Sequence, residues 1–154
     1  MFREMRRKDK ALTNNEMLEI LQTAEYGILS TIGEDGYPYG VPVNYVYHNN
    51  KIYFHAALTG HKLDNIAFNE KVSFCVVKDV ELMPDDFNTK YKSVIAFGKV
   101  KEVPEAEKKD IYVIILEKFS KDFMESGMEY MRKAGDDAKV FQIEIEHMTA
   151  KGKK

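Results

Sequence analysis

The apolar positions follow a helical period at the start of the chain and a strand period soon afterwards. Thr13 and Glu16 have the spacing of a capping box, in which each side chain accepts from the other residue's backbone N–H. Apolar residues then recur at helical spacing and predict a short amphipathic helix over 13–24. The pattern next predicts three short strands separated by polar turns at 33–36 and 48–50; these strands cover residues 26–32, 39–47 and 51–57.

In the second half of the chain, the apolar positions again switch between helical spacing and strand spacing. A short helix is predicted to open at 59–62, with Leu63, Ile66 and Ala67 on its apolar face. Two strands follow at 71–77 and 92–103. Pro104 then begins a helix, Asp122 is predicted to cap another that ends near Gly135, and a last strand covers 140–145.

This order of elements defines a fold class. Strands joined by tight turns pair antiparallel, and the connections at 33–36 and 48–50 are too short for parallel crossovers. Six short strands close best as a barrel, because closure removes exposed edges. We therefore expect a mainly β protein with flanking helices, a six-stranded antiparallel barrel, in one domain over 1–154. Within it, 1–12 form a basic N-terminal arm and 104–135 a helical insertion before the last strand.

Composition narrows the class of protein. The chain has 154 residues and a formal net charge of −2, which favours neither nucleic acid nor an anionic membrane as a partner. Its basic ends are typical of solvated tails. It has no apolar run long enough for a membrane span, and one cysteine, Cys75, suits a reducing cytoplasm. It lacks Trp but has nine Tyr and nine Phe, many of them between Tyr26 and Tyr53.

The segment 54–66 carries the clearest chemical signal. A strand runs through a turn containing Gly60 into a helix, whose first backbone N–H groups have no partner within the helix. The helix dipole, Lys62 and the adjacent His61 add positive charge and donors, which is the chemistry of a phosphate site. The same spacing also fits a plain strand-to-helix turn with surface side chains, and spacing alone leaves both interpretations open.

Other chemistries fit the sequence less well. The histidines at 48, 55 and 61 lie on different elements without metal-ligand spacing, so no metal site is expected. Cys75 falls within a strand pattern, where a thiol is usually inert packing. No glycine-rich nucleotide-binding fingerprint is present.

Four separated segments, 26–32, 35–47, 52–65 and 91–100, resemble a known family. In this order they are similar to the flavin-binding split-barrel proteins of the pyridoxamine phosphate oxidase-like superfamily, and most of all to its nitroimidazole-resistance (Nim-type) branch. The resemblance implies a six-stranded antiparallel split barrel. It also implies a homodimer that binds two FMN molecules in grooves at the interface.

The resemblance also assigns roles to individual residues. Backbone groups of 42–45 would hold the edge of the isoalloxazine, and His55 would lie close to its reactive part on a flavin-facing strand. The turn at 60–62 would bind the phosphate, with His61 where the family often has Arg, and 91–93 would come from the dimer mate. The implied cofactor-binding residues are Pro42, Val43, Asn44, Tyr45, His55, Ala56, Ala57, Gly60, His61, Lys62, Tyr91, Lys92 and Ser93.

The implied activity is that of an FMN-dependent oxidoreductase. It would pass electrons through the flavin to a small acceptor such as a nitroimidazole or another nitroaromatic, with His55 as the catalytic residue. One alternative is a non-catalytic barrel that holds flavin, deazaflavin or haem. Another is a structural or regulatory dimer that uses the apolar run 111–116, although that run fits a buried helix face better than an interface. The end of the chain lacks the Arg-x-His substrate grip of authentic pyridoxamine phosphate oxidases, so oxidation of vitamin B6 is not expected.

Overall fold

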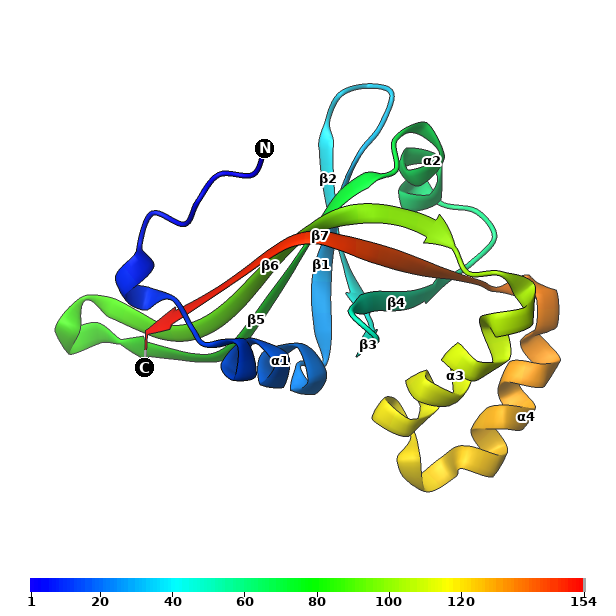
Figure 1. Ribbon diagram of the computed structural model, residues 1–154. Helices are drawn as coiled ribbons and strands as arrows, with labels where there is room; N and C mark the ends of the chain where they lie inside the picture. The colour runs from blue at the N-terminus through cyan, green and yellow to red at the C-terminus, as the bar shows by residue number, and fades with distance from the viewer. Residues whose placement is uncertain (154) are drawn as a thin grey trace.

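A computed structural model describes residues 1–153, and Figure 1 shows an antiparallel sheet with helices at its margins. Four α-helices and seven strands make up this described part, together with short 3-10 turns. The helices are α1 (Asn14–Thr23), α2 (His61–Phe68), α3 (Glu105–Phe119) and α4 (Met124–Ala134). The strands are β1 (Tyr26–Ile32), β2 (Pro38–Asn44), β3 (Val46–His48), β4 (Lys51–Ala56), β5 (Lys71–Met83), β6 (Asn88–Glu102) and β7 (Lys139–Lys153).

The sheet confirms the predicted fold class and corrects the strand count. Its order is β2-β1-β5-β6-β7-β4-β3, and all neighbours pair antiparallel. The predicted strand over 39–47 is broken at Tyr45, so six expected strands become seven. β2 and β3 lie at opposite edges of the sheet, yet only Tyr45 separates them in sequence. The sheet must therefore curl until its edges meet at Tyr45, although hydrogen bonds do not close it there.

Tyr45 is held from three sides at this break. Its ring is buried and meets Phe74 edge-on, and its hydroxyl donates to the carbonyl of Leu21 at 2.7 Å. Its own carbonyl, which no longer has a strand partner, accepts from Lys118 Nζ at 3.0 Å. Lys118 Nζ also lies 4.0 Å from the centre of the Tyr45 ring, in cation–π range. The break is thus satisfied by a helix outside the sheet, which strand periodicity does not reveal.

β5, β6 and β7 are longer than the sequence predicts. β5 and β6 form a hairpin that projects beyond the barrel (Figure 1), and its outer part carries exposed apolar side chains such as Leu82 and Phe87. These positions do not alternate between core and solvent, so the sequence predicts a strand only as far as residue 77. β7 continues to Lys153 because it pairs with β6 along this extension. The basic C-terminal tail is therefore strand up to Lys153, which corrects the expectation of a solvated tail; Lys154 lies outside the described residues.

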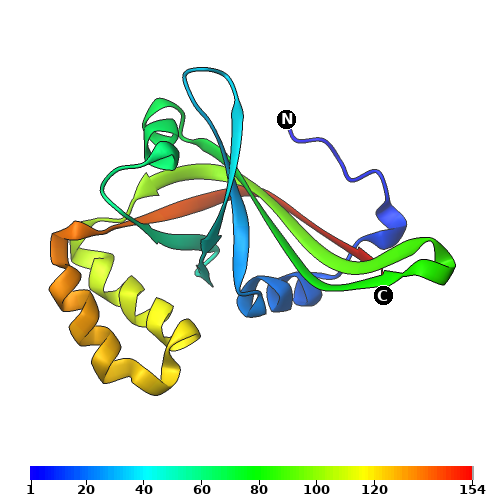
Figure 2. The ribbon, with the colours of Figure 1, turned by 180° about the vertical axis from the view of Figure 1, so that it is seen from behind.

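The α3–α4 helix pair lies at the opposite end of the sheet from the β5–β6 tip, as both views show (Figures 1 and 2). Both helices were predicted, but the prediction that Asp122 caps the second helix was wrong. Asp122 lies in a 3-10 turn over Lys121–Phe123 and makes no capping hydrogen bond, so the second helix begins at Met124. A small apolar cluster joins Tyr112 and Ile115 of α3 to Val140 of β7 and fixes the pair against the sheet.

Candidate functional site

The N-terminus of α2 presents free backbone donors. β4 ends at Ala56, an exposed loop follows, and the helix begins at His61. The residue before it, Gly60, has φ 152° and ψ 166°, a conformation that is essentially restricted to glycine, and no side chain caps the helix. Nothing lies within 4 Å of the position a Cβ would take at Gly60, so space is open in front of the first turn. Lys62 stands in that turn.

The position of α2 is set by a buried polar contact with β1. Asn65 is 4% exposed, and its amide donates to Thr31 Oγ1 at 3.0 Å. Gly33 leaves room for that side chain, since a Cβ there would lie 2.3 Å from Asn65 Oδ1. The helix can therefore lie close against the end of β1. The ring of His61 stacks on Tyr39 of β2 with 3.9 Å between centroids, which ties the first turn to a second strand.

His55 points away from the core at the penultimate position of β4, a largely buried strand. Its neighbours Phe54 and Ala56 face inward, so the alternation of β4 turns the imidazole outward. Partial burial lowers the pKa of His55, and the positive charge of Lys62 lowers it further. Lys62 therefore lies close enough to act on His55, although the two residues lie on different elements. At neutral pH the imidazole is favoured in its neutral form.

Beside His55 lies a hollow of about 490 Å³ between the sheet and the α3–α4 pair. Asn44 and His55 form its sheet side. Its helix side is largely apolar and includes aromatic rings; the lining there is Ile115, Leu116, Phe119, Ser120, Phe123, Ser126, Gly127, Tyr130 and Met131. Phe119 is 38% exposed and lines this hollow instead of packing in the core. Sequence reasoning missed this wall, whose aromatic residues are Phe119 at the end of α3, Phe123 in the 3-10 turn and Tyr130 within α4.

The segment 42–45 reaches the same hollow through Asn44. Pro42 and Asn44 are exposed on β2, while Val43 is half-buried and pairs with Gly27. The Asn44 amide donates to the carbonyl of Glu25 at 2.9 Å, which fixes the end of the strand. Tyr45 and Tyr53 are buried in the core, so their rings do not wall a ligand site. At Tyr45 only the backbone could meet a ligand, and its carbonyl already accepts from Lys118.

Lys118 is a second residue that the sequence did not single out. Burial lowers the pKa of Lys118 to about 8, although Glu25 acts in the opposite direction. It stands on the same helix as the hollow's wall and contacts the chain one residue after Asn44. Its role in this structure is to hold the strand break next to the hollow.

The segment 91–93 lies far from His55 within one chain. On β7, His55 pairs with Val140 and Ser93 pairs with Lys151, eleven positions further along the strand. That separation is about 35 Å for an extended strand. Ser93 is buried and lines a separate cavity of about 190 Å³, and Lys92 forms an ion pair with Asp79 at 3.6 Å. The structure thus places His55 beside the hollow that it shares with Asn44 and within electrostatic reach of Lys62, and leaves 91–93 apart.

Two further features are absent from residues 1–153. No group of three or more His, Cys, Asp or Glu within residues 1–153 is placed to hold a metal ion. Over the same residues, no helix combines the length and apolar character needed to cross a bilayer. Cys75 is half-buried, and burial raises the pKa of its thiol.

Solved structures of the same fold come from several bacteria. A conserved hypothetical protein from Mycobacterium tuberculosis matches with a TM-score of 0.82 at 17% identity, over 97% of this chain and 90% of its own. The FAD and haem binding protein from Mycobacterium smegmatis matches with a TM-score of 0.79 at 15% identity, over 96% and 74%. A protein named for 5-nitroimidazole antibiotic resistance, from Bacteroides thetaiotaomicron, matches with a TM-score of 0.73 at 22% identity, over 91% and 84%.

No curated protein sequence matches this chain significantly. A sequence profile of the pyridoxamine 5'-phosphate oxidase family matches residues 13–152. This range includes all four α-helices and every strand residue except Lys153 at the end of β7. The match spans far more than half of the chain. The chain therefore belongs to the pyridoxamine 5'-phosphate oxidase family, whose members include flavin-binding split-barrel proteins.

Proposed function

We propose that this protein binds FMN at the end of the barrel where α2 begins, and uses it to reduce a small acceptor. One observation carries the proposal: the uncapped N-terminus of α2, with Lys62 in its first turn, lies within electrostatic reach of His55. The N-terminus of α2 with Lys62 suits a phosphate, and the imidazole of His55 suits a place beside a redox centre. The membership of a flavin-binding family supports the same assignment.

The residues present fit the parts of FMN. A phosphate dianion can accept from the free N–H groups after Gly60, where no Cβ or neighbouring atom obstructs the approach. Lys62 supplies charge, and the donors of His61 can add to it. A flat apolar ring needs a hollow with apolar walls, and the hollow at His55 has the volume of an ordinary small-molecule site.

The bound flavin would supply two-electron redox chemistry between a reduced nicotinamide and an acceptor. The chain's own residues have other tasks in this scheme. The aromatic rings of Phe119, Phe123 and Tyr130 pack a ring-shaped acceptor and exclude water from it. The neutral imidazole of His55 would donate a hydrogen bond to the acceptor, and only its imidazolium form would deliver a proton. A nitroaromatic such as a nitroimidazole meets both requirements.

We further propose that the working form is a homodimer. The segment 91–93 lies about 35 Å along β7 from the row of His55, so within one chain it cannot join the site. A second copy can bring its own 91–93 segment to the α2 end of the first. Each dimer would then hold two flavins, and each site would draw on both chains.

The first experiment is a visible spectrum of the purified protein with mass identification of what co-purifies. We expect flavin bands, the mass of FMN, reduction by a nicotinamide cofactor or dithionite, and reoxidation by a nitroimidazole. Lys62→Met should weaken FMN binding at least tenfold, while Lys71→Met on an exposed strand position should not. Colourless protein without FMN affinity would disprove the proposal. A Soret band, or bound flavin without turnover, would instead establish the non-catalytic alternative.

The second experiment tests the shared site by subunit mixing. A Lys62→Met chain damages the phosphate side, and a Ser93→Tyr chain blocks the segment proposed to come from the partner. Each homodimer should lose FMN, whereas mixed dimers should regain one intact site in two. The readout is FMN stoichiometry per dimer together with mass by light scattering. Monomeric protein with full FMN content would rule out the dimeric site and leave FMN binding itself intact.

A further inference from the structure

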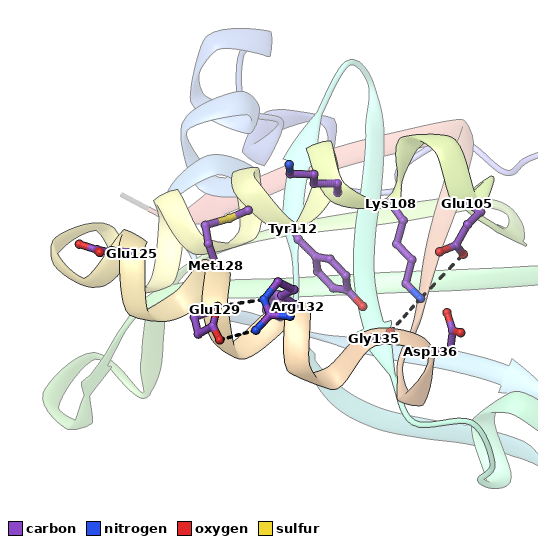
Figure 3. A pocket seen from close by; sticks show the side chains of 11 residues that line it. Glu105, Lys108, Tyr112, Glu125, Met128, Glu129, Arg132, Gly135 and Asp136 are labelled. Atoms are coloured by element: carbon purple, nitrogen blue, oxygen red, sulfur yellow. Dashed lines mark hydrogen bonds and ion pairs between the residues drawn. The ribbon is translucent and has the colours of Figure 1, made fainter.

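The cavity between α3 and α4, of about 530 Å³, is lined partly by charged side chains that already have partners. In Figure 3, dashed lines join the guanidinium of Arg132 to Glu129. Other dashed lines join Lys108 Nζ to Glu105 and to the carbonyl of Gly135. A smaller cavity, of about 190 Å³, is built differently, because one wall is the N-terminal arm and the other is the outward face of β6 and β7. The arm therefore covers part of the sheet.

The covered face carries apolar side chains that the core does not use. Ser93, Ile95 and Phe97 of β6 alternate with the buried Val94 and Ala96, so they point outward. The residues in register with them on β7 are Lys151, Thr149 and His147. We call these six residues the β6–β7 strip. It starts at Ser93, which belongs to the segment proposed to enter the flavin site of a second chain, and its Ile95 and Phe97 remain 40% and 38% exposed.

Phe2 of the arm packs on the far end of the β6–β7 strip. Its ring stacks on His147 with 4.9 Å between centroids and 5° between planes, and lies 5.2 Å from the ring of Phe97. In this closed arrangement, Nε2 of His147 is buried with no hydrogen-bond partner among the described residues. A buried polar atom without a partner costs free energy, so the closed arrangement is opposed at the same place where Phe2 holds it.

The arm also covers the end of the β6–β7 strip that the proposed dimer uses. Arg3 and Met5 line the small cavity together with Ser93. Ser93 is only 8% exposed, although its side chain points away from the core. A second copy that receives 91–93 at its own α2 end needs this outward side, and it meets the arm first.

The covering part of the arm is free to detach. The arm is anchored to β7 where the Leu12 N–H donates to the carbonyl of Ala150 at 3.0 Å. Among the described residues, no hydrogen bond or ion pair joins residues 1–6 to β6 or β7. Packing, with the stacked ring of Phe2 at its centre, is what holds these residues down. They can therefore leave the β6–β7 strip while the anchor at Leu12 stays in place.

We propose that the N-terminal arm is a strap that closes the β6–β7 strip, and that a second copy of the chain displaces it before 91–93 enters the shared site. The inference rests on the proposed dimer and names the step that regulates its assembly. Contacts with the second copy replace the stacking of Phe2, and opening frees Nε2 of His147 to find a partner. Because only the open form can associate, the strap lowers the apparent affinity between two copies.

The test removes the ring that holds the strap. Phe2→Ser should lower the dimer dissociation constant, measured by light scattering over a dilution series, by at least about fivefold, because it raises the open fraction. FMN should bind more tightly in the same variant, since the proposed site needs both chains. Arg6→Ser, at an exposed arm position outside the cavity, is the matched control and should leave both affinities unchanged.

The 13C-labelled methyl group of Met5 reports on the arm itself. In the unmodified protein its NMR signal should move toward the position of an exposed methionine as dimers form, and in Phe2→Ser it should lie there at every concentration. A dissociation constant that is unchanged or higher in Phe2→Ser would overturn the strap and leave the proposed dimer standing. So would a Met5 signal that dimer formation does not move. Monomers at every concentration in both proteins would instead refute the proposed dimer, and the strap with it.

Discussion

The positive charge of Lys62 on α2 lowers the pKa of the His55 imidazole on β4, after the larger effect of partial burial. The two residues belong to separate elements, joined by the exposed loop that ends at Gly60. The charge proposed to attract a phosphate thus also tunes the group proposed to meet the acceptor. Any anion that neutralises Lys62 must raise the pKa of His55.

Lys62→Met should therefore raise the pKa of His55, because the repulsion between two cations is removed. The remaining effect of burial should keep the value below that of an exposed histidine. Titration of the imidazole by NMR measures the change, and inorganic phosphate added to the unmodified protein should shift the pKa in the same direction. Lys99→Met, on an exposed position of β6, is the control. An unchanged His55 titration in Lys62→Met would show that the two groups do not interact.

Gly60→Ala should destabilise the protein by about 1–3 kcal/mol, because φ 152° with ψ 166° is a conformation that residues with a Cβ avoid. The substitution meets no steric obstacle, since the space around Gly60 is open, so the effect isolates backbone strain. Urea unfolding gives the change in free energy of unfolding. Gly40→Ala, on β2 with no positive φ, should have a smaller effect. FMN affinity should fall with Gly60→Ala if the turn holds the phosphate.

Asn65→Ala should destabilise the protein by about 1–3 kcal/mol, because it leaves Thr31 without its buried partner and opens a small void. Gly33→Ala should act through the same contact, since its Cβ would displace the Asn65 side chain. A double-mutant cycle with Thr31→Val and Asn65→Ala measures the interaction by urea unfolding. Thr59→Val, at an exposed position of the loop, should be nearly neutral. Strict additivity in the cycle would contradict the role given to the Thr31–Asn65 contact.

The sequence predicted most of the elements because their apolar faces repeat with a regular period. The capping box at Thr13, the strand 26–32 and the helix after Pro104 all have clear local signals. The break at Tyr45 could not be predicted in this way, because it depends on Lys118, which lies 73 residues away in sequence. The β5–β6 extension was missed for another reason: its exposed apolar residues break the alternation.

The candidate site likewise has one part that the sequence predicted and another that it did not. The turn at 60–62 was predictable, because Gly, a helix start and Lys lie within a few residues of one another. The aromatic wall of the hollow was not, because it comes from helices packed against the sheet through tertiary contacts. The distance between His55 and 91–93 emerges only from the register of β7 with both of its neighbours.

The lowered pKa of Lys118 predicts how the free energy of unfolding changes with pH. Its pKa is lowered to about 8 in the folded protein, below the value near 10.5 of an exposed lysine. Between these values the unfolded chain binds more protons than the folded one, so this residue's contribution makes the protein more stable as pH rises from 8 to 10.5. The free energy of unfolding of the unmodified protein, relative to Lys118→Met, should increase over that interval. A constant difference between the two proteins would show that Lys118 keeps an ordinary pKa. Lys121→Met, on the neighbouring exposed turn, should show no such trend.

Two buried tyrosines should respond to loss of their hydroxyls with opposite signs. Tyr45 donates to the carbonyl of Leu21 at 2.7 Å, so Tyr45→Phe should lower the free energy of unfolding by about 1 kcal/mol. The hydroxyl of Tyr112 has no partner, and a buried unpaired hydroxyl costs about 1–3 kcal/mol of stability. Tyr112→Phe should therefore stabilise the protein when no ligand is present. Urea unfolding of both variants, with Tyr37→Phe as the exposed reference, measures the contrast. If Tyr112→Phe destabilises the protein as Tyr45→Phe does, the Tyr112 hydroxyl is already satisfied within the fold.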